Sequence, residues 1–272
     1  MRSCLVAILI RATALAATTP PPSVDCEKLA ASADLNYDQA VERSEDGMPI
    51  GNGRMGTLVW TTPSALRFQI NRVDVFAINS ASDSFPQRHT DHCGGSGFVD
   101  IDFDDYRNAF PPEKTKQHLS CVDGLVTVQG PGVQAEVLTW SKRDVIAVQV
   151  TDLRKLPGTI AINLRMLRPP FVRTASHTAT SKIDSSGRRI FLTQQFAEGD
   201  YYCGSAVAIS VAGRDATVRR QNEEEIRLVL PPKPGRFTVF VASAAGFDRD
   251  KDLVASAAGQ PTKPSWRGSP LC

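Results

Sequence analysis

Aromatic residues, blocks of like charge and long apolar runs are all scarce in this sequence. Phe, Trp and Tyr make up only 7% of its 272 residues, and its formal net charge is +2. The charged residues are interspersed, which excludes the basic stripe of a nucleic-acid-binding protein, so we expect no nucleic-acid partner. After the first residues, no apolar stretch approaches the roughly 20 residues of a membrane span, so we expect no membrane partner.

Several sequence motifs of metal-binding and catalytic sites are also absent. No two cysteines have the C-x-x-C spacing of a structural zinc site, and no G-x-S-x-G sequence marks a hydrolase nucleophile. His118 and His177 stand alone in polar segments. The stretch "HTDHC" (His89–Cys93) precedes a glycine-rich run, and we interpret it as a surface loop rather than a metal site. We therefore predict no metal and no cofactor.

The N-terminal segment predicts a secretory signal peptide over residues 1–17. Arg2 precedes the short apolar run Cys4–Ile10, and Ala14–Ala16 supplies small residues for cleavage. An unprocessed N-terminus and an organellar transit peptide are the alternatives. Residues 18–36 form a proline-rich lead-in that can include a short helix. We expect a secreted protein, either extracellular or periplasmic.

Five cysteines remain once the signal peptide is removed, and an exported chain can oxidise them. Cys272 is the last residue and is the natural odd one out. We expect at least one disulfide among Cys26, Cys93, Cys121 and Cys203, which permit three pairings that the sequence cannot distinguish. The last two flank strand patterns, so they could instead be buried free thiols.

The stretch Gly51–Gly56 matches G-x-G-x-x-G, and Asp74 follows about twenty residues later, as in dinucleotide-binding folds. A dinucleotide-binding site requires a buried strand before the glycines and a helix after them. Residues 43–50 are charged and interrupted by turn formers, whereas Thr57–Pro63 favours a strand. The motif therefore predicts a turn that feeds a strand at Thr57, and no nucleotide site.

From Gly56 onward, strand patterns dominate. About a dozen short apolar or alternating segments follow one another, separated by Asp-Gly, Pro-Gly and similar turn sequences. There is no room for the helices that parallel βαβ units need. The sequence predicts an all-β fold, a large antiparallel β-sandwich over residues 37–248, with short helical or disordered ends. Residues 249–272 are typical of a linker or of the start of a missing helical domain.

Two segments carry a family resemblance. "PIGNGRMG" (Pro49–Gly56), followed by a strand, a turn and "INRVDVF" (Ile70–Phe76), resembles the N-terminal β-sandwich of glycoside hydrolase family 95-like proteins. It is more similar still to the related domain of unknown function 5703. In these proteins the glycine turn leads into the first long strands of a supersandwich. Later blocks such as "LTQQFAEGDYYCGSAVAI" (Leu192–Ile209) fit the same domain, so the resemblance covers Tyr37–Phe247.

The departures from this family limit what the resemblance implies. Family 95 fucosidases usually carry Asn-Glu-Asp-Thr where this chain has Asn71–Asp74, so fucoside specificity is not implied. The family's catalytic residues lie in an (α/α)6 barrel after the sandwich, whereas this sequence stops at Cys272. The resemblance implies a non-catalytic accessory domain of a secreted glycoside hydrolase-like protein, whose partner is a C-terminal helical barrel.

Asn52 and Arg54 are the candidate site residues, in a loop that would face the barrel or the substrate. The alternative is that the glycines adopt positive φ while the asparagine bonds its own backbone. Glycoside hydrolysis needs two carboxyl groups about 5–10 Å apart. The best available acidic group consists of Asp100, Asp102, Asp104 and Asp105. Its alternation with apolar residues indicates a solvated strand face instead.

Two further functions remain open at this point. A stand-alone carbohydrate-binding module would need aromatic platforms for sugar rings, but Trp60, Trp140 and Trp266 are far apart in the sequence. A divergent, self-sufficient glycoside hydrolase would need a paired-acid motif. The sequence favours the accessory domain over both.

Overall fold

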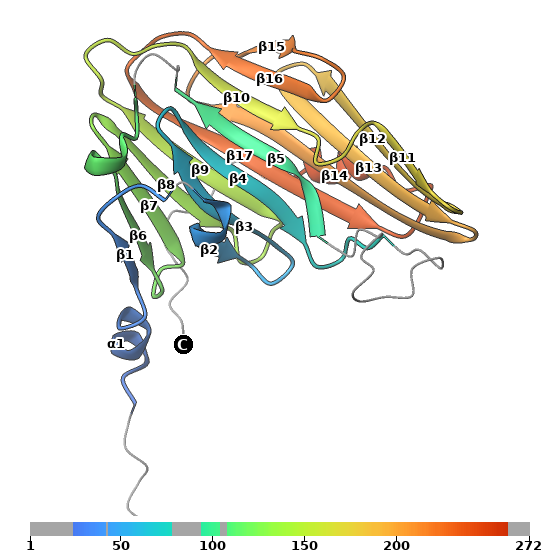
Figure 1. The fold of residues 1–272 in the computed structure, drawn as a ribbon, viewed down its shortest axis with the longest axis horizontal. Helices are drawn as coiled ribbons and strands as arrows, with labels where there is room; N and C mark the ends of the chain where they lie inside the picture. The colour runs from blue at the N-terminus through green and yellow to red at the C-terminus, as the bar shows by residue number, and fades with distance from the viewer. Residues whose placement is uncertain (1–23, 42, 78–93, 104–107, 261–272) are drawn as a thin grey trace, which may run out of the picture.

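A computed structural model of the chain describes residues 24–41, 43–77, 94–103 and 108–260. It is an all-β sandwich in which two antiparallel sheets lie face to face (Figure 1). Two short α-helices and two single-turn 3-10 helices accompany the strands in these ranges. They are α1 (Cys26–Ala31), η1 (Ser44–Asp46), η2 (Pro112–Lys114) and α2 (Leu253–Ala258). The predicted fold class is confirmed.

The larger sheet has ten strands in the order β1-β6-β7-β8-β9-β17-β14-β13-β12-β11. Strands β6 to β9 and β11 to β14 form two series of consecutive hairpins, and β17 joins them because it pairs with both β9 and β14. In sheet order the strands are β1 (Leu35–Tyr37), β6 (Lys116–Ser120), β7 (Leu125–Gly130), β8 (Val133–Thr139), β9 (Val145–Asp152), β17 (Gly235–Gly246), β14 (Tyr201–Ala212), β13 (Arg189–Glu198), β12 (His177–Ser186) and β11 (Phe171–Thr174).

The smaller sheet has seven strands in the order β15-β16-β10-β5-β4-β3-β2 and forms the front layer of Figure 1. In sheet order the strands are β15 (Thr217–Arg220), β16 (Glu225–Leu230), β10 (Ile160–Arg165), β5 (Gly94–Asp102), β4 (Ala65–Arg72), β3 (Met55–Thr62) and β2 (Met48–Gly51). A register shift between Ile70 and Asn71 interrupts the pairing of β4 with β5.

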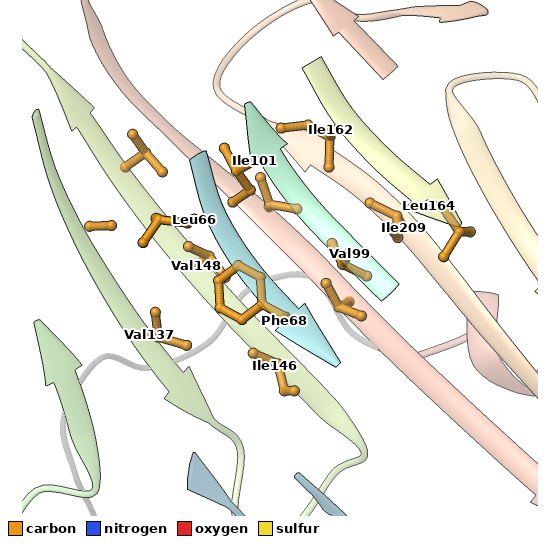
Figure 2. Packing of buried hydrophobic residues seen from close by; sticks show 14 of the residues in the cluster. Leu66, Phe68, Val99, Ile101, Val137, Ile146, Val148, Ile162, Leu164 and Ile209 are labelled. Atoms are coloured by element: carbon orange, nitrogen blue, oxygen red, sulfur yellow. The ribbon is translucent and has the colours of Figure 1, made fainter. Parts of the chain in front are cut away.

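The core lies between the two sheets. Because side chains alternate along a strand, every second residue of the central strands points inward. Figure 2 shows Leu66 and Phe68 of β4 beside Val99 of β5, and they pack toward Ile146 and Val148 of β9. These five side chains are almost completely buried. One apolar cluster spans both sheets and holds the sandwich together.

Helix α2 covers part of the outer face of the larger sheet. Asp252 caps its first turn, since the carboxylate accepts a hydrogen bond from the amide of Ala255 at 2.8 Å. Leu253 and Ala257 pack on a second, smaller apolar cluster that includes Phe191 and three alanines of β14 and β17. This helix lies within residues 249–272, for which the sequence left open a linker or the start of a helical domain.

The glycine turn lies inside a β-hairpin. The predicted turn without a following helix is confirmed, but the strand begins at Met55, two residues before Thr57. The segment before the turn also forms a strand, β2, which the charged residues 43–47 conceal in the sequence. Met48 and Ile50 face the core, so two inward residues suffice to hold this edge strand in place.

The cysteines within the described residues are not oxidised. Cys26 is exposed, Cys121 is half-buried and Cys203 is buried, and all three are free thiols. Cys93 lies outside the described residues, as does the rest of the His89–Cys93 segment. The expected disulfide is therefore not formed by these three residues, and the thiol of Cys203 matches the alternative of a buried free cysteine.

Candidate functional site

Asn52 fastens the glycine turn of one sheet to a turn of the other. Its side-chain oxygen accepts hydrogen bonds from the backbone amides of Arg54 (3.0 Å) and Met55 (2.9 Å). Its amide nitrogen donates to the carbonyl oxygens of Trp140 (3.1 Å) and Arg143 (2.8 Å), in the connection between β8 and β9. The local bonding expected of an asparagine in a turn is present, and the contact with the second sheet is additional.

The glycines of the motif are required by the backbone. Gly53 has a φ of +87°, a conformation that L side chains rarely adopt. A Cβ atom on Gly51 would lie 2.9 Å from the carbonyl oxygen of Met55, and one on Gly56 would lie 2.9 Å from that of Ile50. The G-x-G-x-x-G spacing thus serves a tight hairpin turn rather than a phosphate group.

Asp144 accepts hydrogen bonds both from the glycine turn and from strand β4. Its carboxylate accepts from the amide of Asn52 at 3.3 Å, from Nε of Arg54 at 3.1 Å and from Nη1 of Arg72 at 3.2 Å. The side chain is only 11% exposed, whereas that of Arg54 is 58% exposed. The sequence shows this aspartate only as the last residue of a "SKRD" turn, so its role was not foreseen.

Arg72 lies at the centre of the network, with its side chain only 3% exposed. Nε and Nη2 both donate to the carboxylate of Asp74 at 2.7 Å, and Nη1 donates to the hydroxyl of Ser243 on β17 at 2.7 Å. Burial acts to lower the pKa of Arg72, but the hydrogen bonds and charges of Asp74 and Asp144 outweigh it and raise the pKa. The guanidinium is therefore held in its charged form.

The pKa of Asp74 is lowered in turn. Partial burial acts to raise it, and the two hydrogen bonds from Arg72 together with that residue's charge outweigh the burial. Both carboxylates of the network, Asp74 and Asp144, are thus paired with arginines. This ion-pair network joins β4, the β8–β9 turn and β17 across the sandwich, and the lowered pKa of Asp74 is the opposite of what a proton-donating carboxyl group needs.

The acidic group on β5 differs from what the sequence predicts. Asp100 is only 3% exposed, so the expected solvated face is wrong at this residue. Arg67 donates to one of its oxygens at 3.4 Å, and Nε of Arg165 donates to the other at 2.7 Å. Long arginine side chains from the neighbouring strands β4 and β10 cover the carboxylate, which alternation alone cannot reveal. Asp104 and Asp105 lie outside the described residues.

The two histidines within the described residues lie in different places. Nε2 of His118 is 3.1 Å from the carboxylate of Asp34, whose other oxygen accepts from the amide of Cys121 at 2.7 Å. His177 is buried and stacks on the ring of Phe196. Among the residues that the structure describes, no group of three or more His, Cys, Asp or Glu side chains is placed to hold a metal ion.

Two of the grooves on the larger sheet have volumes of about 500 Å³ or more. The first, which we call the helix groove, has a volume of about 610 Å³ and lies between α2 and β13, β14 and β17, where Phe191, Phe240 and Val254 line it. The second, which we call the polar groove, has a volume of about 500 Å³. It is lined by Asn36, Tyr37, Asp38, Lys116, Gln117, His118, Thr127, Gln129 and Gln134.

The molecule is thus a two-sheet antiparallel β-sandwich with a buried ion-pair network between its layers. A human-microbiome protein assigned as a kojibiose phosphorylase is similar to it, with a TM-score of 0.45, 11% identity, and 83% of this chain and 34% of that chain covered. The GH92 family glycosyl hydrolase ccman5 has a TM-score of 0.34 and 13% identity, with 76% and 31% covered. The chain therefore spans about a third of the length of each. No protein-family model and no curated protein matches it.

No helix among the described residues has the length and apolar character needed to cross a membrane.

Proposed function

We propose that this β-sandwich is the non-catalytic N-terminal accessory domain of a secreted glycoside hydrolase-like protein. The chemistry would belong to a helical (α/α)6 barrel that follows it in the longer protein. The proposal starts from the resemblance of Pro49–Gly56 and Ile70–Phe76 to such domains, and these two segments contribute the turn and the arginine of the ion-pair network.

The pairing of the carboxylates is the observation that carries the non-catalytic assignment. A glycosidase keeps one carboxyl group protonated by raising its pKa and holds a second, ionised one near it. Here the pKa of Asp74 is lowered instead, and Asp144 is bound by two arginines. Asp100 likewise has an arginine on each oxygen. These acids are engaged in ion pairs within the sandwich, which supports an accessory role.

The helix groove is the surface that we assign to the barrel. Val254, Ala255 and Ala258 of α2 form one wall, and Phe191 and Phe240 form the floor. The rest of the lining is mixed, with Ser186, Arg188, Arg189, Ser210 and Asp252. A channel beside a helix suits a second helix, because ridges of side chains on one helix fit the grooves of another. The first helix of the barrel would lie along α2 and bury Val254, Ala255 and Ala258, since Phe191 and Phe240 are already buried.

Two experiments test the proposal. The purified chain is expected to hydrolyse no aryl-fucoside, aryl-galactoside or aryl-glucoside, and turnover that disappears in Asp100→Asn would overturn the non-catalytic assignment. In the second, the chain is co-expressed with the region encoded downstream. The two are expected to copurify, and Val254→Asp should weaken the complex because it places a charge in the helix groove. Val24→Asp, at a position 66% exposed, is the matched control.

A second candidate function, carbohydrate binding by the sandwich itself, is favoured by one specific observation. The polar groove is lined by amide, hydroxyl and charged side chains. It lies at the β1–β6–β7–β8 end of the sheet, away from the helix groove.

A further inference from the structure

The polar groove lies on β1, β6, β7 and β8, and the register of these strands with β9 arranges its side chains. Residues that lie directly opposite each other in antiparallel strands share one face of the sheet. The pairing therefore sets out two polar rows on the outer face, across the strands at the left of Figure 1. The first row is Asn36, His118, Thr127, Glu136 and Gln149, and the second is Lys116, Gln129 and Gln134. Glu136 and Gln149 continue the first row beyond the lining of the groove.

The inward positions of the same strands are apolar. Val126 and Val128 of β7 and Ala135 and Val137 of β8 are completely buried in the main core. The polar rows thus stand on a sheet whose other face is fixed by packing. A ligand on the outer face would meet a rigid scaffold and would need little reordering of the backbone.

Several of the groups in the rows are already held in place. Glu136 accepts hydrogen bonds from the side-chain amides of Gln134 at 3.2 Å and Gln149 at 3.0 Å. His118 is oriented by Asp34 at 3.1 Å. The hydrogen bond from the amide of Cys121 is the main cause that lowers the pKa of Asp34, so this carboxylate stays ionised beside the imidazole. Fixed side chains lose less conformational entropy when a ligand binds.

The chemistry of the lining selects the class of ligand. Sites for drug-like molecules are mostly apolar with a few polar groups, whereas the side chains of the two rows are all polar. They offer amide donors and acceptors, a hydroxyl, an imidazole, one ammonium group and the carboxylate of Glu136. Lys116 and Asp38 carry opposite charges at the groove. A ligand that satisfies such a surface must itself be rich in hydrogen-bonding groups, such as hydroxyl groups, and carry no large net charge.

We propose that the polar groove is a binding site for a short neutral oligosaccharide. The choice of a saccharide among polyhydroxylated ligands rests on the proposed function, in which the sandwich belongs to a carbohydrate-active protein. The location of the site rests on the register and on the groove alone. Vicinal hydroxyl groups of a sugar ring would bond the exposed Gln129 and Lys116, and the partly exposed Gln134 would bond the next ring.

The test uses the full chain and a panel of neutral hexasaccharides of glucose, mannose and xylose, with an oligogalacturonate as the charged probe. Binding is measured by calorimetry and by backbone-amide chemical shifts. We expect at least one neutral probe to bind, with shifts confined to β1, β6, β7 and β8. Gln129→Ala should weaken binding about fivefold, the loss expected for one neutral hydrogen bond. The double variant Lys116→Ala/Gln129→Ala should weaken it further.

Gln195→Ala is the matched control, because Gln195 is an exposed glutamine on β13, far along the same sheet. It should bind as the unmodified chain does, and circular dichroism should show that all variants are folded. Three results would overturn the proposal: no binding by any neutral probe, tighter binding of the oligogalacturonate, or equal losses in Gln129→Ala and Gln195→Ala. None of them bears on copurification with the downstream region, so failure here is distinguishable from failure of the accessory-domain proposal.

Discussion

Arg72 of β4 and Asp144 before β9 connect the two sheets of the sandwich. Nη1 of the arginine donates to the carboxylate at 3.2 Å, and the carbonyl oxygen of Asp144 accepts from the amide of Ser243 on β17 at 2.9 Å. The arginine side chain is 3% exposed and that of the aspartate is 11% exposed. Removing one partner of a buried ion pair lowers the stability of the fold, because the charge of the other partner then stays buried without a counter-charge.

Replacement of Asp144 by alanine should therefore destabilise the fold. We expect a loss of about 2–4 kcal/mol in the free energy of unfolding, since Arg72 retains Asp74 but loses its second carboxylate. Urea denaturation followed by circular dichroism measures this. Asp215→Ala is the control, because the pair of Asp215 with Arg188 is exposed and should change stability by less than about 1 kcal/mol. Equal losses in the two variants would contradict the role of the network.

The glycine turn should depend on the side chain of Asn52. Alanine at this position removes two acceptor contacts within the turn and the donor to the β8–β9 connection, so we expect a loss of about 1–3 kcal/mol. Asn222→Ala removes one exposed hydrogen bond to Glu224 and serves as the control, with a loss under about 1 kcal/mol. An Asn52→Ala chain as stable as the parent would show that the cross-sheet contact contributes nothing.

Acid should weaken the fold through Asp74. Its pKa is lowered in the folded state, so the unfolded chain binds the proton more tightly. The stabilisation is complete above the unfolded pKa of about 3.9 and is lost as the pH falls through the lower folded pKa. Urea midpoints from pH 6 down to acid measure the slope. Asp74→Asn should be less stable at neutral pH and should show a shallower slope, and parallel curves would be evidence against this assignment.

The thiols should differ in reactivity. Cys203 is completely buried, and burial raises its pKa, so little thiolate is present to react. Cys26 is exposed. Timed labelling with iodoacetamide and mass spectrometry should show rapid modification of Cys26 and none of Cys203 until the chain is unfolded in urea. A disulfide-linked Cys203 peptide in a non-reduced digest would contradict the free thiol.

Much of the fold follows from local patterns. The alternation in β4, β5, β7, β8 and β9 indicates strands, and short turn sequences between them leave no room for crossover helices. The turn at Gly51–Gly56 can also be predicted from the sequence, because the residues that follow it favour a strand. The sequence pattern does not indicate that β12 is a strand. Its inward-facing residues are only partly apolar: His177, Ala179, Ser181 and Ile183.

The ion-pair network shows the limit of sequence reasoning. Arg72 and Asp74 are close in the chain, but Asp144 and Ser243 reach them only because β4, β9 and β17 meet across the sandwich. Similarly, the alternating pattern predicts that Asp100 is solvated, whereas in the structure arginines from two neighbouring strands cover it. The periodicity of a strand shows which face of the sheet a side chain occupies. It does not show which side chains from other strands cover that face.

The sequence by itself determined the all-β class, the antiparallel sandwich and the glycine turn, because these depend on residues that are near one another in the chain. Only the tertiary structure decided which charges pair, which thiol is buried and where polar side chains from four strands form a groove. Strand order and register bring those residues together from positions up to 171 apart, as for Arg72 and Ser243. Such long-range pairing is set by the packing of the whole core, which no local pattern encodes.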